Sequence, residues 1–456
     1  LLEYPHIPRQ MNWDMIDIAL SVRFIPSPET GFIGIHKLPP AHTLLWEKGA
    51  LTIERYWDLP SEITKDSYEL CKEKLTSLFS DSVRERMISD VPLGAFLSGG
   101  VDSTSVVAAM AQQSARPIKT FVISMDGTSE DQRYARIAAD TFGTDHHEIA
   151  ISDIDYQKEV RNLVAYYDEP FFDQSALPTT VISRYIKKEV TVVLSGDGGD
   201  ELFGGYEAYS VARLLERYQH IPKWIRAALS RVALPNSLRY RAEVMERPFL
   251  SSYAEYYSLW KRNLPLSKRY ITKSDVYKKE FYNNTSLDSI TQLFNEWFGT
   301  TKDRVAGAMR ADIYGRLADG YLTKTDIGTM ASALELRTPF LDHRLVEYAA
   351  TIPSAWKIKS GGKYIWKDIA RALIPDVIIN RKKMGFSIPL DRMVNNQLAP
   401  LIQEVLGNPQ SALYEKIEYK TMRLLINDHA NHRADYSNHV WSLLMLELWI
   451  QTYIGK

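Results

Sequence analysis

Short apolar runs alternate with helical patterns through residues 90–200, and this alternation leaves few folds open to the chain. One run, "DVPLGAFL", ends at Leu97, a second, "KTFVISM", covers residues 119–125, and a third opens the segment "VTVVLSGDGGDE" at residues 190–201. Strands and helices in this order predict an α/β fold with a doubly wound, mostly parallel sheet that carries helices on both faces. Ligands of such sheets bind outside the carboxyl ends of the strands.

Glycine and acidic residues follow two of these three predicted strands, as "SGGVDST" at residues 98–104 and "SGDGGDE" at residues 195–201. Gly99 and Gly100 let backbone N–H groups converge without obstruction from a Cβ atom, and Ser103 or Thr104 is placed to cap the helix that follows. The helix N-terminus adds a partial positive charge, so this loop forms a cradle whose usual anion is phosphate. The alternative is an ordinary strand–turn–helix corner.

The glycine spacing excludes the commonest loops of this kind. No segment fits the GxxxxGK[ST] loop, and the third glycine place of a GxGxxG fingerprint that starts at Gly196 is taken by Glu201. The GxSxG elbow also fails, because Phe96 stands at its first glycine. The pattern that remains is Ser-Gly-Gly-x-Asp-Ser directly after a strand.

This loop resembles the pyrophosphate-binding loop of the ATP pyrophosphatase superfamily, whose members split ATP into AMP and pyrophosphate. Four further segments are similar, in order, to the synthetase half of the glutamine-dependent asparagine synthetases. They are "DEPFFDQSALPTT" (168–180), "SGDGGDELFGGY" (195–206), "SALELRTPFLDHRL" (332–345) and "RKKMGFSIP" (381–389). The resemblance implies a sheet of the adenine nucleotide alpha-hydrolase type with a large helical C-terminal part.

A β-hairpin is predicted ahead of this region, because "HTLLWEKGALTIERYWDLP" alternates around Lys48 and Gly49. It resembles the end of the family's N-terminal glutaminase domain, so we divide the chain into residues 1–60, an incomplete glutaminase-type domain, and residues 61–456, the synthetase domain. The family's glutaminase uses an N-terminal cysteine, whereas this chain begins with Leu1. We therefore expect the chain to use ammonia, with the glutaminase domain as a missing partner.

The resemblance implies that a carboxylate attacks the α-phosphorus of ATP and leaves as an acyl-adenylate, while the site neutralises the departing pyrophosphate. Phe96, Leu97 and Ile123 are expected to line the adenine slot. Ser195 and Gly196 are expected to close over the ribose. The predicted residues for nucleotide and pyrophosphate together are Phe96, Leu97, Ser98, Gly99, Gly100, Asp102, Ser103, Thr104, Ile123, Ser195 and Gly196.

Two aspartates, Asp102 and Asp200, follow the first and third predicted strands and are the candidate metal ligands. Magnesium prefers oxygen ligands, and one or two carboxylates together with phosphates suit it. The alternatives are a helix N-cap for Asp102 and a turn aspartate for Asp200. ATP and Mg²⁺ are thus the expected cofactors.

Three further residues have catalytic roles that only the resemblance implies. Lys383 of "RKKMGF" would bind the α-phosphate and the leaving pyrophosphate, and Lys363 would be a second phosphate-binding lysine. Glu335 would accept a proton from the incoming amine. The alternatives are a solvated basic run for Lys383 and a surface pair with Arg337 for Glu335.

The sequence therefore predicts an ATP-dependent carbon–nitrogen ligase that converts aspartate, ammonia and ATP into asparagine, AMP and pyrophosphate. Ile327 in "KTDIGTM" stands where the family usually has arginine, which leaves open a related synthetase with another acceptor. Such relatives close β-lactam or peptide rings or amidate sugar acids. An alternative of another class is a tRNA-modifying ATP pyrophosphatase.

Composition decides between classes of partner. The chain has 55 Lys and Arg residues against 56 Asp and Glu residues and no CxxC pair, which argues against nucleic acid and the tRNA alternative. Cys71 is the single cysteine, which suits a reducing cytoplasm, and no run of eighteen apolar residues predicts a membrane span. The expected partners are ATP, a carboxylate acceptor and ammonia, and a homodimer is a further expectation.

Overall fold

The computed structural model describes residues 1–124, 130–150, 154–210, 276–279, 287–382 and 388–455, together with Arg213 and Pro222. The statements below concern these residues. None of the helices among them is both long enough and apolar enough to cross a membrane.

A five-stranded sheet with the order β5-β4-β3-β6-β7 forms the centre of the chain, and all of its pairings are parallel. The strands are β3 (Leu93–Phe96), β4 (Lys119–Ser124), β5 (Asp145–Ala150), β6 (Val192–Leu194) and β7 (Glu335–Arg337). From β3 the chain adds β4 and β5 on one side and later β6 and β7 on the other. This reversal is a topological switch point, where ligands of open α/β sheets bind. The predicted parallel α/β sheet is confirmed.

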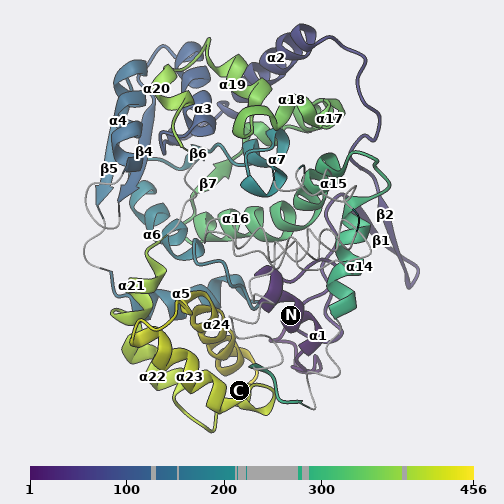
Figure 1. The fold of residues 1–456 in the computed structure, drawn as a ribbon, viewed down its shortest axis with the longest axis vertical. Helices are drawn as coiled ribbons and strands as arrows, with labels where there is room; N and C mark the ends of the chain where they lie inside the picture. The colour runs from purple at the N-terminus through teal and green to yellow at the C-terminus, as the bar shows by residue number, and fades with distance from the viewer. Residues whose placement is uncertain are drawn as a thin grey trace.

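Helices cover both faces of the sheet, as Figure 1 shows. Buried residues of α2 (Tyr68–Arg86), α3 (Val101–Gln113) and α4 (Glu130–Phe142) form one apolar cluster, which includes Cys71. On the other face, Ile182 of α6 (Ala176–Ile186) joins a smaller cluster with Phe121 and Val193. The helix α16 (Thr323–Met330) packs against α6. A sheet buried on both faces explains why its central strands are continuous apolar runs.

The C-terminal part is helical, as predicted, and has its own core. Its helices are α21 (Leu390–Asn395), α22 (Ala399–Leu406), α23 (Tyr419–Ala430) and α24 (Ser437–Tyr453), and they pack with α5 (Tyr156–Tyr167). The aromatic side chains Trp441 and Trp449 are buried there. The N-terminal helix α1 (Trp13–Val22) belongs to the same core. Buried apolar residues between positions 16 and 32 thus share a core with the C-terminal helices, while the predicted domain boundary stays a prediction.

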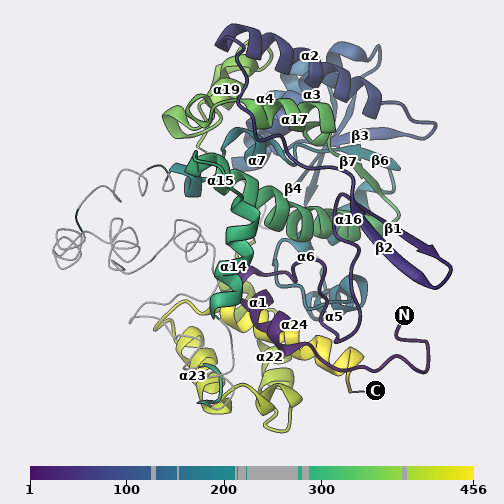
Figure 2. The same ribbon diagram turned by 90° about the vertical axis from the view of Figure 1, so that its right-hand side faces the viewer.

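The predicted β-hairpin is present, with β1 (His42–Glu47) paired antiparallel to β2 (Ala50–Arg55) around Lys48 and Gly49, which both have positive φ. Figure 2 shows it projecting from the rest of the chain. Nearly every residue of both strands is exposed, and Trp46 is 66% exposed. The remaining α-helices are α7 (Gly199–Phe203), α14 (Leu287–Phe298), α15 (Arg304–Ala311), α17 (His343–Thr351), α18 (Ser354–Lys357), α19 (Tyr364–Ala370) and α20 (Asp376–Ile379). A π-helix covers Asp312–Leu322, and 3₁₀ turns cover Pro339–Leu341, Lys359–Gly361 and Ala412–Glu415.

Candidate active site

A cavity of about 320 Å³ lies at the carboxyl ends of β3, β4 and β6, next to the switch point of the sheet. The predicted site residues that line it are Phe96, Leu97, Ser98, Gly100, Asp102, Ser103, Ile123, Ser195, Gly196, Asp200 and Lys363. Gly99, Thr104 and Glu335 are not among its lining residues. Lys383 lies outside the described residues. The two loops singled out in the sequence therefore meet at one cavity.

The N-terminus of α3 faces this cavity without a side-chain cap. Gly100 is its N-cap residue, so the prediction that Ser103 or Thr104 caps it is wrong. The helix begins earlier than expected, and the Ser103 hydroxyl donates to the Gly100 carbonyl oxygen (3.3 Å) and accepts from the Ser98 N–H (3.3 Å). Thr104 is fully buried inside the helix. Because the N-cap residue makes no side-chain cap bond, the N-terminus of α3 can bind an anion through its first N–H groups.

Two glycines let the loops approach neighbouring helices closely, Gly99 the helix α4 and Gly196 the helix α3. Gly99 has a φ of +66°, and a Cβ atom there would lie 2.4 Å from the backbone of Tyr134 in α4. A Cβ atom on Gly196 would lie 2.7 Å from the backbone nitrogen of Ser103. Any larger residue would therefore separate the second loop from the N-terminus of α3.

The two predicted metal-binding carboxylates converge on one ammonium group. The Lys363 Nζ atom contacts Asp102 Oδ2 and lies 2.6 Å from Asp200 Oδ1. The side chains of the three residues are 9%, 17% and 20% exposed, respectively. Burial acts to lower the pKa of Lys363, but the charges of both carboxylates and their hydrogen bonds raise it above its usual value.

The structure does not fit the two structural alternatives, a helix N-cap for Asp102 and a turn aspartate for Asp200. Asp102 is the second residue of α3 rather than its N-cap, and Asp200 lies inside α7 rather than in a turn. Both side chains instead hold a cation at the cavity. Two carboxylates that share one positive charge are also a suitable pair of ligands for Mg²⁺, which takes carboxylate and phosphate oxygens.

The cavity is also lined by cationic side chains to which the sequence analysis assigned no role. The Arg381 guanidinium donates to the Ser98 carbonyl oxygen (2.8 Å), contacts Asp131, and lies 4.5 Å from the centre of the Tyr134 ring. Lys367 lies one turn after Lys363, and burial and the charge of Lys363 lower its pKa. The others are Lys324 and Lys382. Arg381, Lys382 and Lys324 stand inside segments that carried the resemblance, whereas Lys367 has no signal in the sequence.

Glu335 is placed differently from the other predicted residues. It pairs with Val192, the first residue of β6, and therefore lies away from the carboxyl end of the sheet. Its side chain is 54% exposed and accepts a hydrogen bond from Arg337 Nε at 2.7 Å. The next residue, Leu336, lines the cavity instead. The pair with Arg337 is the surface arrangement considered above, and a catalytic role for Glu335 stays a prediction.

A second cavity, of about 390 Å³, lies on the other side of α7. It contains two buried ionisable groups. Burial and the charge of Asp200 raise the pKa of Glu201 to about 7, and its Oε1 atom accepts a hydrogen bond from Tyr206 at 2.6 Å. Burial lowers the pKa of Lys357 to about 8. The adjacent residues Asp200 and Glu201 thus face different cavities.

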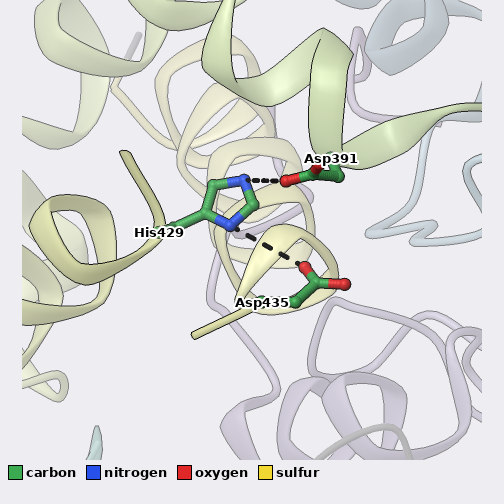
Figure 3. A group of neighbouring side chains, drawn as sticks. All are labelled: Asp391, His429 and Asp435. Carbon is green, nitrogen blue, oxygen red and sulfur yellow. Dashed lines mark ion pairs between the residues drawn. The ribbon is translucent and has the colours of Figure 1, made fainter. Parts of the chain in front are cut away.

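Figure 3 shows Asp391, His429 and Asp435, the group that could hold a metal ion within the part of the chain that the structure describes. His429 Nε2 lies 3.5 Å from Asp391 and Nδ1 lies 3.7 Å from Asp435. Nδ1 also accepts a hydrogen bond from the Tyr436 N–H (3.3 Å). The two carboxylates thus lie against different ring nitrogens of His429.

Comparisons with known proteins agree with this architecture. A family model described as asparagine synthase matches residues 74–451. The chain is 30% identical to asparagine synthetase (glutamine-hydrolyzing) 1 of Bacillus subtilis, over 98% of this chain and 70% of that protein. It is 28% identical to a putative asparagine synthetase (glutamine-hydrolyzing) of Mycobacterium tuberculosis, over 95% of this chain and 66% of that protein. It is also 24% identical to amidase chry2 of Gibberella zeae, over 79% of this chain and 59% of that protein.

Proposed function

Since this chain belongs to the asparagine synthase family, we propose that it activates a carboxylate with ATP and then amidates the carboxylate with ammonia. The acceptor carboxylate attacks the α-phosphorus of ATP and pyrophosphate leaves. Ammonia then attacks the carbonyl carbon of the acyl-adenylate, and AMP leaves with the electrons of the broken C–O bond. With aspartate as acceptor the product is asparagine.

One observation carries this proposal: the uncapped N-terminus of α3 lies at the same cavity as two carboxylates that share the ammonium of Lys363. The first N–H groups of α3 and the Ser98 hydroxyl would bind the pyrophosphate oxygens, which gain charge as the bond to the α-phosphorus breaks. Lys363 would oppose the same charge. Asp102 and Asp200 would hold Mg²⁺, which neutralises phosphate oxygens when it is bound.

The roles proposed for Lys383 and Glu335 depend on the family resemblance alone. Lys383 would bind the α-phosphate and the leaving pyrophosphate. Glu335 would take the proton that the amine loses as it attacks.

A second acceptor class has some support, because relatives named amidase match most of the chain. Ile327, which replaces the arginine usual in the family, is not among the residues that line the cavity. It packs against the helical core instead. The cavity therefore gains no cation at this position, and a related synthetase that acts on another carboxylate is the second candidate.

We also propose that a glutaminase-type domain supplies the ammonia. Relatives named glutamine-hydrolyzing are longer than this chain, which covers 70% and 66% of two of them. The hairpin β1–β2 exposes Leu44, Trp46 and Ile53, and an isolated hairpin is marginally stable. A further domain that packs against this hairpin would bury these apolar side chains.

The test is a screen of carboxylic acids for pyrophosphate release with ATP, Mg²⁺ and ammonium. Formation of asparagine from aspartate would support the main proposal, and release only with larger or ring-forming acids would favour the second candidate. Asp200→Asn is the matched control, since it should lose the activity and keep the circular dichroism spectrum. Release that needs no carboxylic acid, or that depends on tRNA, would contradict both candidates.

A further inference from the structure

Lys357 is a buried cation in the second cavity, the one on the far side of α7 from the candidate active site. It is the last residue of α18, is 5% exposed and lines this cavity of about 390 Å³. Within the part of the chain that the structure describes, its ammonium forms no hydrogen bond and no ion pair. A buried charge is costly unless an opposite charge or several hydrogen bonds compensate it. An anion in the cavity would supply that compensation.

The other charged side chains that line the cavity already have partners. Arg310 donates a hydrogen bond to Asp58 Oδ1 at 2.9 Å, so these two charges compensate each other. Glu201 accepts its hydrogen bond from the Tyr206 hydroxyl at 2.6 Å. Among the described residues that line this cavity, Lys357 is therefore the cation without a partner.

Asp303 is the acidic residue whose charge acts on Lys357, but the two form no ion pair. Its carboxylate caps α15 and accepts hydrogen bonds from the N–H groups of Val305 and Ala306, both at 3.0 Å. This cap holds the carboxylate at the start of α15, so it does not replace a ligand at the Lys357 ammonium.

Much of the remaining wall of the cavity is apolar. It is lined by Leu59, Leu202, Met309, Ile313 and Ile352. One ammonium balances one negative charge, which favours a carboxylate over a phosphate group with its charge of about −1.5 to −2. The apolar wall favours a ligand whose body is a short hydrocarbon chain. The volume of the cavity lies within the range of small-molecule sites.

The second cavity is separate from the candidate active site. The two cavities share no lining residue, and the neighbours Asp200 and Glu201 of α7 face the first and the second, respectively. Figures 1 and 2 show α7 beside α15 and α17, two of the helices that line the second cavity. A ligand can therefore bind there while a nucleotide is bound in the first cavity.

We propose that the second cavity binds a small aliphatic carboxylate, whose charged end pairs with Lys357 and whose hydrocarbon body contacts the apolar wall. This site goes beyond the proposed function and does not depend on it. Two sources share the required chemistry, a short branched fatty acid and an apolar amino acid.

The test is calorimetry with 4-methylpentanoate as the probe, at pH 6.5, where Lys357 is charged because its pKa is about 8. Mg²⁺ and a non-hydrolysable ATP analogue are present throughout. Lys357→Met should weaken binding about 10- to 100-fold, the range for one charge-assisted hydrogen bond. Acetate, which lacks the hydrocarbon body, should bind the wild type at least about 10-fold more weakly. Lys359→Met removes an exposed charge two positions away and is the matched control, which should bind normally.

The neutral amide, 4-methylpentanamide, tests the charge of the ligand without any variant, so the proposal stays testable if Lys357→Met does not fold. It should bind the wild type about 10-fold more weakly than the acid does and should bind Lys357→Met with the same affinity as the wild type. Leucine distinguishes the two sources. Binding as tight as that of 4-methylpentanoate identifies an apolar amino acid, weaker binding identifies a fatty acid, and both results support the site.

Three results would overturn the proposal: no binding of the acid while the ATP analogue is present, equal affinities of the wild type for acid and amide, or equal affinities of wild type and Lys357→Met for the acid. Each of them leaves the proposed function standing. Conversely, binding of the probe to a protein that releases no pyrophosphate with any carboxylic acid would contradict the proposed function and support the site.

Discussion

Lys363→Met tests whether one lysine compensates the two carboxylates at the cavity. The substitution removes the ammonium and retains a side chain of similar length. Asp102 and Asp200 would then remain close together in a largely buried site without their shared cation. Since like charges repel strongly where water is excluded, the folded state should lose free energy relative to the unfolded chain.

The expected loss of unfolding free energy can be estimated from the geometry of the ion pairs. At an effective dielectric constant of about 20, one ion pair at the Lys363–Asp200 distance of 2.6 Å contributes about 6 kcal/mol before the cost of desolvation is subtracted. Removing one partner from a buried pair costs about 3–5 kcal/mol net. Mg²⁺ at 100 times its dissociation constant should return about 2.7 kcal/mol, because it binds the folded state alone. In the wild type the same ion competes with Lys363, so its stabilising effect should be smaller.

The assay is denaturation by urea at pH 8, followed by tryptophan fluorescence, with and without Mg²⁺. The midpoint of Lys363→Met should fall without the metal and recover when Mg²⁺ is added. Lys367→Met is the matched control, because burial disfavours the charge of Lys367 and its removal should not destabilise the fold. A variant as stable as the wild type without metal, or an equal effect of Mg²⁺ on both proteins, would refute the reasoning.

Three further predictions concern other residues. The folded pKa of Glu201, about 7, lies above its usual 4.5, so its contribution to stability is complete below pH 4.5 and is lost as the pH rises through 7. The wild type should therefore lose on the order of 3 kcal/mol of unfolding free energy between pH 4.5 and pH 8, and Glu201→Gln should not show this loss. Denaturation at a series of pH values measures it, and the same pH profile for both proteins would contradict this prediction. Trp46→Ser and Ile53→Ser should each change the free energy of unfolding by less than about 0.5 kcal/mol, because both side chains are exposed, and a loss above 1 kcal/mol would show that the hairpin is packed. Glu335→Gln should slow asparagine formation but leave ATP–pyrophosphate exchange unchanged if Glu335 acts on the amine. Equal effects on both rates would exclude that role.

The parallel sheet and its two glycine-rich loops could be predicted because each depends on local sequence. The central strands β3, β4 and β6 are buried on both faces and read as apolar runs. Strand β5, with the sequence "DHHEIA", lies at the sheet edge, and β7 has three residues, two of them charged. Neither has the periodicity that identifies a strand, so the sheet could be predicted only in part.

The contacts of the site depend on residues that are distant in the chain. Lys363 and Asp102 are 261 positions apart, and no local pattern indicates that an ammonium joins the two acidic loops. The predicted helix cap is wrong because serine and threonine are common caps, whereas here α3 begins directly after Gly100. Lys324 stood inside a segment that carried the family resemblance, but its direction depends on the packing of α16 against α6.

Comparing the stability of the Lys363→Met and Lys324→Met variants tests whether the two lysines have different roles in the cavity. Lys363 already has two carboxylate partners, so removing its charge without ligands should destabilise the fold. Among the residues that the structure describes, the Lys324 ammonium forms no hydrogen bond or ion pair, so Lys324→Met should leave the melting temperature of the ligand-free protein unchanged or raise it. Of the two variants, therefore, only Lys363→Met should lose stability. Destabilisation by both substitutions would mean that Lys324 has a structural role and is not a free subsite of the cavity.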